Sequence, residues 1–158
     1  MPHGENIILI LEGNVVVRVL LKDIAEEAVL MAPGRELPEP VRRIAASVPA
    51  ELEPLAIFTD VFDGIFRYLS QILLEQADYP EQRFWRQIAA CLHTYRRENP
   101  ACAAAFDRHE LFTPEFRHSC LNRLQLRNHR QMVDLSDPTS ALQFAGTLRN
   151  PVARYASS

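Results

Sequence analysis

Two polar residues near the start of the chain have the side-chain types that bind a magnesium ion: Asn6 and Asp23. A side-chain carbonyl and a carboxylate together supply oxygen ligands of the kind that Mg²⁺ prefers, and Mg²⁺ usually keeps positions for water and substrate phosphates. Asp23 follows Asn6 by seventeen positions in the sequence. A magnesium site therefore requires the intervening residues to fold back on themselves.

The intervening residues predict a β-hairpin. Residues 7–12 and 15–21 are short apolar runs rich in β-branched residues, and Gly13-Asn14 between them suits a two-residue turn with positive φ. With those two turn residues, Ile10 faces Val17 and Asn6 faces Leu21. Asp23 then shares a sheet face with Asn6 as its diagonal neighbour, at about 7–8 Å.

The hairpin geometry leaves a second interpretation open. The same residues also fit a solvated strand end, with an ordinary turn asparagine and a helix-capping aspartate. A slip of one residue in the pairing would move Asn6 and Asp23 to opposite faces. The magnesium hypothesis thus depends on the register of the two strands.

Both apolar runs lack a polar face, which is typical of interior strands that are covered on both sides. No other segment of the sequence is predicted to be a strand that could flank them. A lone two-stranded hairpin is marginal in water and leaves both edges unpaired. The rest of the sheet is therefore expected to be missing from this chain or to come from another copy.

Everything after the hairpin is predicted to be helical or irregular. Apolar residues recur at helical spacing from Leu55 to Leu73 and again from Phe84 to Tyr95, which predicts two long amphipathic helices packed as antiparallel neighbours. Shorter helices are expected at residues 41–48, 101–107 and 114–127. The fold class is α+β, mainly α, in a single region spanning 1–158, with hairpin 6–22, helical part 41–128 and irregular tail 134–158.

Composition excludes several function classes. The 158 residues suffice for one domain, and a net charge of −3 gives no general attraction to nucleic acid or anionic membrane. Cys91, Cys102 and Cys120 have no metal-ligand spacing and are interpreted as reduced thiols of a cytoplasmic protein. No signal peptide precedes the first strand, and no apolar run approaches the roughly 20 residues that cross a bilayer.

Several motifs together resemble one enzyme family. "HGEN" at residues 3–6, an apolar hairpin, and "KDIAEE" at 22–27 are similar to the NRPS-independent siderophore synthetases of the aerobactin-synthetase type. The segments "FTDVFDGIFRYL" and "RFWRQIAACLHTY", and the stretch from residue 112 to 151, fit the same family. The resemblance covers nearly the whole chain, and it corresponds to the C-terminal portion of longer enzymes.

The resemblance implies a fold and a reaction. Members are cytoplasmic ligases that depend on ATP and Mg²⁺, activate a carboxylate of citrate or a citrate derivative as an acyl-adenylate, and condense it with an amine or hydroxyl. The nucleophile is a polyamine, amino acid or amino alcohol. The fold resembles a cupped hand, and this chain corresponds to its palm-like region. The main ATP-gripping residues are expected upstream, so the chain alone is expected to be inactive.

The resemblance also assigns roles to individual residues. His3 corresponds to a catalytic histidine of the ATP and carboxylate site, where it could neutralise or hydrogen-bond developing negative charge. Glu5 lies near the substrate, and Asn6 and Asp23 correspond to positions near the metal and the phosphates. Arg127 could hold a substrate carboxylate with its planar guanidinium. Many members have a lysine six residues before this arginine, whereas this chain has Leu121.

Two other classes of function remain open from the residues. One is a non-catalytic helical interaction module derived from the same family. The other is a phosphotransferase, although the chain lacks a glycine-rich phosphate loop and a lysine to grip the nucleotide. The histidines at 93, 109, 118 and 129 show no ligand spacing and are interpreted as structural, as is Arg67.

Overall fold

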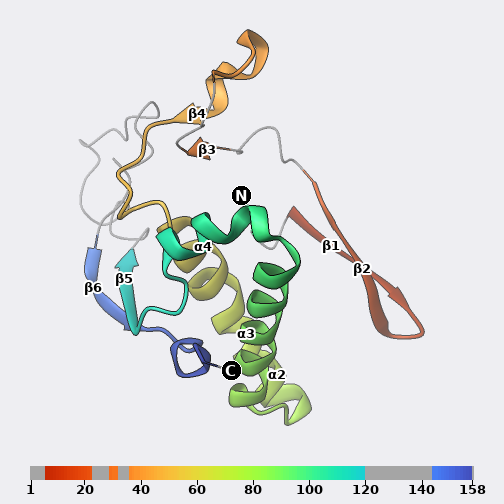
Figure 1. Ribbon diagram of the computed structural model, residues 1–158. Helices are drawn as coiled ribbons and strands as arrows, with labels where there is room; N and C mark the ends of the chain where they lie inside the picture. Colours follow the sequence, from red (N-terminus) through yellow and green to blue (C-terminus); the bar gives the residue numbers. More distant parts are fainter. Residues whose placement is uncertain (1–5, 23–28, 32–35, 120–143, 158) are drawn as a thin grey trace, which may run out of the picture.

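The computed structural model describes residues 6–22, 29–31, 36–119 and 144–157. A helical body forms its centre, a hairpin projects on one side of that body, and a second strand pair lies on the other side (Figure 1). The α+β fold class, with an N-terminal antiparallel hairpin, is confirmed. The predicted elements and the observed ones differ mainly in the C-terminal third.

The N-terminal hairpin consists of β1 (Ile7–Glu12) and β2 (Val15–Leu21), paired antiparallel. Both turn residues have positive φ, 55° at Gly13 and 66° at Asn14, as the sequence predicts for a two-residue turn. Most of its apolar side chains are about half exposed; Leu9, for instance, is 50% exposed. Among the described residues, β1 and β2 form a two-stranded sheet, and what flanks it stays a prediction.

Short elements connect the hairpin to the helical body. β3 (Leu30–Met31) and β4 (Ala45–Ala46) form a two-residue parallel pair, and the 3₁₀ helix η2 (Glu39–Ile44) lies between them. The helix predicted at 41–48 is thus shorter and begins earlier. Pro38 at its N-cap and Pro40 in its first turn explain the early start, because proline has a backbone angle suited to a helix beginning.

The long helix predicted from Leu55 to Leu73 has two parts. The first, η3 (Ala56–Phe66), is a π-helix, which continues into the α-helix α2 (Arg67–Ala77). The wider hydrogen-bonding pattern is visible where the Arg67 amide donates to the Phe62 carbonyl five residues earlier. Phe58 and Phe62 are buried, whereas Leu69 and Ile72 are 39% and 54% exposed. The predicted apolar stripe is therefore buried along its first half, whereas in its second half Leu73 packs partly buried against the core.

The second long helix is α3 (Glu81–Glu98), which Pro80 introduces. The short connection through Asp78 turns the chain back, and Asp78 adopts the left-handed conformation that ends α2. Phe66 contacts Phe84 at 5.8 Å between ring centroids, and Phe62 contacts Trp85 at 5.9 Å. The predicted antiparallel helix pair is confirmed. After it come η4 (Pro100–Cys102) and α4 (Ala103–His109), close to the helix predicted at 101–107.

Two strands stand where the sequence predicted a helix and an irregular tail. β5 (Glu115–Ser119) pairs antiparallel with β6 (Phe144–Arg149), and the 3₁₀ helix η5 (Ala153–Tyr155) follows. The helix expected from Pro114 is wrong over residues 115–119, which form β5, and the rest of that predicted helix, with the predicted end of the helical part at residue 128, lies outside the described residues. The tail 134–158 is not irregular where it is described. Each strand is stabilised by a partner distant in sequence, which local periodicity does not reveal.

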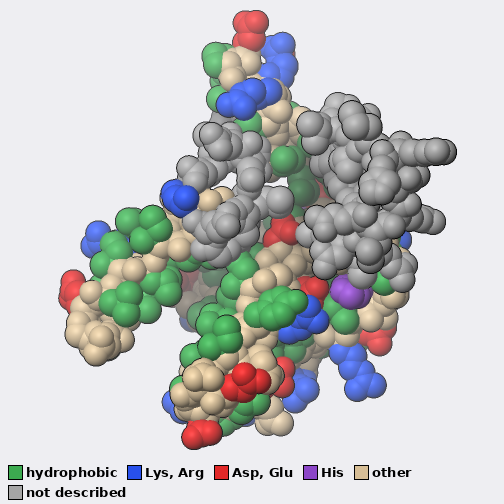
Figure 2. Space-filling model, turned by 180° about the vertical axis from the view of Figure 1, so that it is seen from behind, with side chains coloured by type: hydrophobic (Ala, Val, Ile, Leu, Met, Phe, Trp, Pro, Cys, Tyr) green, Lys and Arg blue, Asp and Glu red, His purple; other side chains and the backbone are tan. Residues whose placement is uncertain are grey.

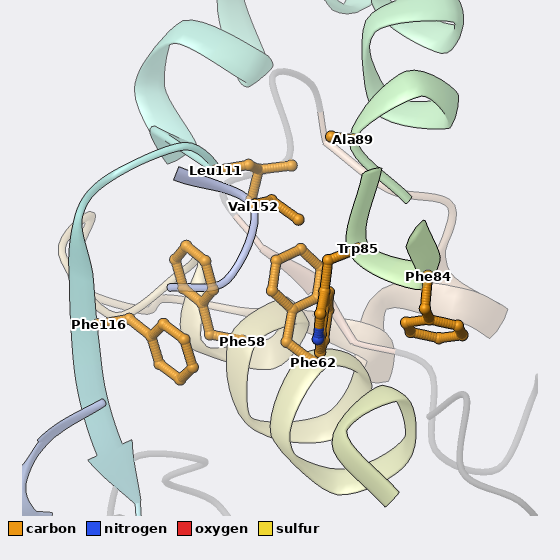
Figure 3. Close-up of a cluster of buried hydrophobic side chains, with 8 residues drawn as sticks. All are labelled: Phe58, Phe62, Phe84, Trp85, Ala89, Leu111, Phe116 and Val152. Atoms are coloured by element: carbon orange, nitrogen blue, oxygen red, sulfur yellow. The ribbon is translucent and has the colours of Figure 1, made fainter. Parts of the chain in front are cut away.

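The hydrophobic core lies where η3, α3 and β5 meet. Its buried side chains are Phe58, Phe62, Phe84, Trp85, Ala89, Leu111, Phe116 and Val152 (Figure 3). Phe58 stacks on Phe116 with ring centroids 4.6 Å apart, and Val152 is fully buried. This aromatic cluster joins the helices to the C-terminal strands, which the sequence did not assign to the core.

Candidate functional site

The base of the hairpin holds the described part of the predicted site. Near the turn the register agrees with the prediction, since Glu12 pairs with Val15 and Leu11 pairs with Val16. A β-bulge then changes the pairing, and Ile10 faces Arg18 instead of Val17. Val17 is the extra residue of β2. The sequence contains no glycine or proline at this point to signal the bulge.

The bulge displaces the predicted partner of Asn6 by one residue. Ile7 pairs with Leu21, and the Lys22 amide donates a hydrogen bond of 3.0 Å to the Asn6 carbonyl. The predicted pairing of Asn6 with Leu21 is therefore wrong, and Lys22 lies opposite Asn6. A one-residue change in register reverses which residues share a face. Because Lys22 now lies opposite Asn6, the argument that Asn6 and Asp23 share a sheet face no longer holds.

Asn6 differs from the strand that follows it in being buried. Its exposed fraction is 6%, against 45% for Ile8 two residues later. The hairpin thus has a protected base and an exposed body. A buried amide of this kind is held by hydrogen bonds, and its side-chain oxygen is a suitable ligand type for Mg²⁺.

The other predicted site residues lie outside the described residues. These are His3, Glu5, Asp23 and Arg127. Their assignments stay predictions. Among the described residues, no group of three or more histidine, cysteine, aspartate or glutamate side chains is placed to hold a metal ion.

Two charged clusters that the sequence analysis missed lie in the helical body. In the first, Glu53 is 6% exposed and accepts hydrogen bonds from Arg108 Nε at 3.0 Å and His109 Nε2 at 3.1 Å. The hydrogen bond from His109, followed by that from Arg108, lowers the pKa of the Glu53 carboxyl below its usual value. This cluster ties the segment before η3 to the end of α4.

The second cluster joins η3 to β5. Asp63 contacts Arg67 Nε at 2.9 Å on the same helical stretch, and His118 Nε2 of β5 lies 3.7 Å from its other oxygen. Arg67 also lies over the Tyr68 ring at 4.8 Å. The structural interpretation of Arg67 and His118 agrees with these contacts. Such pairs join residues far apart in sequence, so spacing alone did not find them.

The remaining described histidine also has a structural contact. His93 Nε2 lies 2.8 Å from the Tyr155 carbonyl, and its ring stacks on Phe112 at 4.5 Å between centroids. This contact holds η5 against α3. Together with the Asp63 and Glu53 clusters, it shows that the described histidines connect distant segments of the fold.

Two open grooves lie away from the hairpin. One, of about 400 Å³, runs along α4 and includes Arg96, Asp107 and Ala156. The other, of about 280 Å³, lies between residue 50 and β5 and carries both charge types, including Glu51, Arg108 and Arg117. None of the residues that line either groove belongs to β1 or β2. Neither groove therefore coincides with the predicted site at Asn6.

The comparisons with known proteins define the family. Residues 1–134 match a protein family described as "Ferric iron reductase FhuF-like transporter". The chain belongs to this family. It is 41% identical over 158 residues to the putrebactin synthase of Shewanella sp. (strain MR-4), covering 100% of this chain and 25% of that protein. It is also 30% identical over 130 residues to an aerobactin synthase of Escherichia coli, covering 80% of this chain and 22% of that protein.

Solved structures agree on the fold. The aerobactin synthetase IucC of Klebsiella pneumoniae superimposes with a TM-score of 0.71 at 28% identity, over 96% of this chain and 26% of that one. The petrobactin biosynthesis protein AsbB of Bacillus anthracis superimposes with a TM-score of 0.70 over 96% of this chain and 26% of that one. At 20% sequence identity, this second match supports the fold alone. The resemblance to NRPS-independent siderophore synthetases is confirmed. The chain spans about a quarter of the length of the curated relatives it matches.

No described helix is both long and apolar enough to cross a lipid bilayer.

Proposed function

We propose that this chain forms the C-terminal part of an ATP-dependent siderophore synthetase that joins a carboxylate to an amine or hydroxyl. The observation that carries the proposal is the 41% identity with a putrebactin synthase over all 158 residues. The relatives' names describe biosynthetic enzymes, whereas the family description speaks of a ferric reductase-like transporter. The relatives carry more weight because the similarity extends beyond residue 134, through β6.

The proposed reaction has two steps. A carboxylate oxygen of citrate or a citrate derivative attacks the α-phosphorus of ATP, which forms an acyl-adenylate and releases pyrophosphate. The nitrogen or oxygen of a polyamine, amino acid or amino alcohol then attacks the acyl carbon, forms an amide or ester, and releases AMP. These substrates, with a cytoplasmic location, follow from the family resemblance.

The residues at the hairpin base have defined roles in this proposal. His3 hydrogen-bonds or neutralises negative charge that develops on the carboxylate or phosphates, and Glu5 lies beside the substrate. The family resemblance, in place of the lost argument from a shared sheet face, assigns Asn6 and Asp23 to Mg²⁺, which would supply positive charge to the phosphates when bound. The burial of Asn6 beside exposed strands is consistent with a protected site at this end of the hairpin. Arg127 would bind a substrate carboxylate through its guanidinium.

A chimaera tests the proposal. This chain replaces the corresponding quarter of the 41% identical putrebactin synthase, and acyl-adenylate is trapped with hydroxylamine in the presence of ATP, Mg²⁺ and citrate. We expect hydroxamate from the chimaera and none from the 158-residue chain alone. A folded but inactive chimaera would contradict the proposed function, and robust hydroxamate from the isolated chain would contradict its dependence on further polypeptide.

The alternative is a non-catalytic interaction module, and the exposed apolar hairpin favours it. Nine large apolar residues of β1 and β2 are 45% to 63% exposed, from Ile8 at the low end to Val15 at the high end. A module would fold and bind its partner without supporting turnover in the chimaera. The same experiment therefore separates the two functions.

A further inference from the structure

The side chains of α2 that face the core are not the ones that its sequence predicts. Ser70 is 3% exposed, and its hydroxyl donates to the Arg67 carbonyl of the same helix, so its hydrogen bond does not depend on the core. Leu69 and Ile72, which continue the predicted apolar stripe, are 39% and 54% exposed. Figure 2 shows hydrophobic side chains on the surface of the helical body. A polar residue is thus buried while two aliphatic residues of the same helix are not.

The π-helix η3 accounts for this rotation of α2. Each amide of a π-helix bonds the carbonyl five residues before it rather than four, so the chain turns less per residue than in an α-helix. Phe58, Phe62 and Phe66 lie along one side, with successive ring centroids 5.5 Å and 6.2 Å apart. The difference in turn accumulates over eleven residues. Phe66 therefore packs against the core, and Ile65 is not among the described side chains that do so.

Gly64 has a tight backbone contact inside η3. A Cβ atom added at this position would lie 3.0 Å from the carbonyl oxygen of Thr59, five residues earlier. Because this neighbour belongs to the backbone, it cannot move aside as the end of a flexible side chain does. Glycine is also among the poorest formers of an α-helix. The residue at position 64 therefore favours the π-helix over the α-helix in two ways.

The same segment has an α-helical alternative. Apolar residues at α-helical spacing extend through both η3 and α2, and residues 55–77 contain no proline. At the end of η3 the Arg67 amide bonds the Phe62 carbonyl, and the α-helix follows directly. Conversion exchanges each bond to the fifth preceding carbonyl for a bond to the fourth, so the amides keep partners. α2 would then turn Leu69 and Ile72 toward the core.

We propose that η3 and α2 together form a two-position element, in which η3 is either a π-helix or part of one continuous α-helix. The π position buries Phe66 and Ser70, and the α position buries Leu69 and Ile72 in their place. Each position buries apolar surface that the other exposes, so the two contributions offset each other. A contact made in one position alone is then sufficient to select it.

The rotation also changes the contact between η3 and β5. In the π position Asp63 lies 2.9 Å from Arg67 Nε and 3.7 Å from His118 Nε2 of β5. A change in helical turn moves Asp63 around the helix axis relative to β5, so the contact with His118 belongs to the π position. The element thus couples the orientation of α2 to β5. This proposal does not depend on the synthetase chemistry.

Two thiol reporters distinguish the positions. Ser70→Cys places a thiol that is buried in the π position, and Ile72→Cys places one that is buried in the α position. Each is made in a chain whose three native cysteines are replaced by serine. When the two positions exchange rapidly, the labelling rate of a buried thiol is proportional to the population that exposes it.

Gly64→Ala supplies the shift between positions, because the added Cβ atom opposes the π-helix and alanine favours the α-helix. Gln87→Ala, at an exposed position of α3, is the matched control. We expect Gly64→Ala to raise the labelling rate of the Ser70→Cys thiol at least about tenfold and to lower that of the Ile72→Cys thiol. The control should change neither rate, and circular dichroism checks that each variant is folded.

Two outcomes of this labelling overturn the proposal. Unchanged rates of both thiols in folded Gly64→Ala would show that the α position is not accessible. A rise in both rates would show that the segment loosens rather than rotates.

The urea dependence of labelling, measured with Gly64 in place, provides a test that does not require Gly64→Ala to fold. Rotation between two folded positions exposes little new surface, so labelling of the Ser70→Cys thiol should depend only weakly on urea. Ala89→Cys, at a core position of α3 that is 1% exposed, reports on unfolding and should depend steeply on urea. A Ser70→Cys thiol that follows the same steep dependence would be labelled through unfolding alone, which overturns the two-position element.

Discussion

The Phe58 ring of η3 stacks on the Phe116 ring of β5, with centroids 4.6 Å apart and planes inclined by 5°. Both side chains are buried, and they connect helices to strands that are distant in sequence. Phe58→Ala is expected to lower the free energy of unfolding by about 3–5 kcal/mol, through lost burial and a cavity. Urea denaturation measures the change. Tyr68→Ala, at a side chain that is 57% exposed, is the control, and an equal loss in both would contradict the importance of this stack.

Asn150 connects the C-terminal segment to the loop before β5. Its side-chain amide donates to the carbonyls of Leu111 at 2.9 Å and Thr113 at 2.7 Å, and its oxygen accepts from the Val152 amide at 3.2 Å. Asn150→Ala leaves these backbone groups without their partner, at a cost of about 1–3 kcal/mol for a buried group.

Thermal denaturation, together with hydrogen exchange of the β6 amides, measures the loss of stability caused by Asn150→Ala. Asn99→Ala is the matched control, because the Asn99 amide also donates to a backbone carbonyl, that of Tyr95, but at an exposed helix end. Asn150→Ala should lower Tm clearly more than the control. Unchanged exchange in β6 would show that the strand is held by other contacts.

The Glu53 cluster predicts a dependence of stability on acid pH. The pKa of the Glu53 carboxyl is lowered, mainly by the hydrogen bond from His109 and then by that from Arg108. A carboxyl with a lowered folded pKa contributes stability above its unfolded pKa, about 4.3, and loses it as pH falls through the folded value. Glu53→Gln is therefore expected to be less stable than wild type near neutral pH, with the difference shrinking in acid.

Urea midpoints of both proteins between about pH 3 and pH 7 test this prediction. Glu51→Gln is the control, because Glu51 lies two residues before Glu53 and is exposed. A difference between wild type and Glu53→Gln that stays constant across this range would show that the charge of Glu53 does not contribute to stability.

Charge at the proposed catalytic end predicts kinetic effects in the chimaera. Removing one side chain that stabilises the charge developing in the transition state typically lowers the rate by about 100–1000-fold. Asp23→Ala and His3→Ala are each expected to lower kcat/KM by about this factor, with little change in Tm. Arg18→Ala on the exposed strand β2 is the control. Near-normal turnover of both variants at saturating Mg²⁺ would remove the metal and charge-stabilising roles.

The sequence by itself determined the elements whose causes are local. Gly13 and Asn14 take positive φ because these two residue types tolerate it, and the turn they form is confirmed. The helices η3, α2 and α3 follow from apolar spacing within each segment, with Pro80 between the last two. The family resemblance, and with it the candidate residues His3, Glu5, Asn6, Asp23 and Arg127, also came from the sequence; of these, the structure describes Asn6.

Tertiary structure decided what depends on distant partners. Phe116 lies between the charged residues Glu115 and Arg117, which is the alternation of a strand. The strand β5 is nevertheless stabilised by β6, which lies more than twenty residues away in sequence. Asn150, which follows β6, donates a hydrogen bond to the Thr113 carbonyl just before β5. Likewise Val17 has no property that announces a bulge, but the bulge sets Lys22 opposite Asn6. Register and long-range pairing are properties of two segments together, so neither segment's sequence contains them alone.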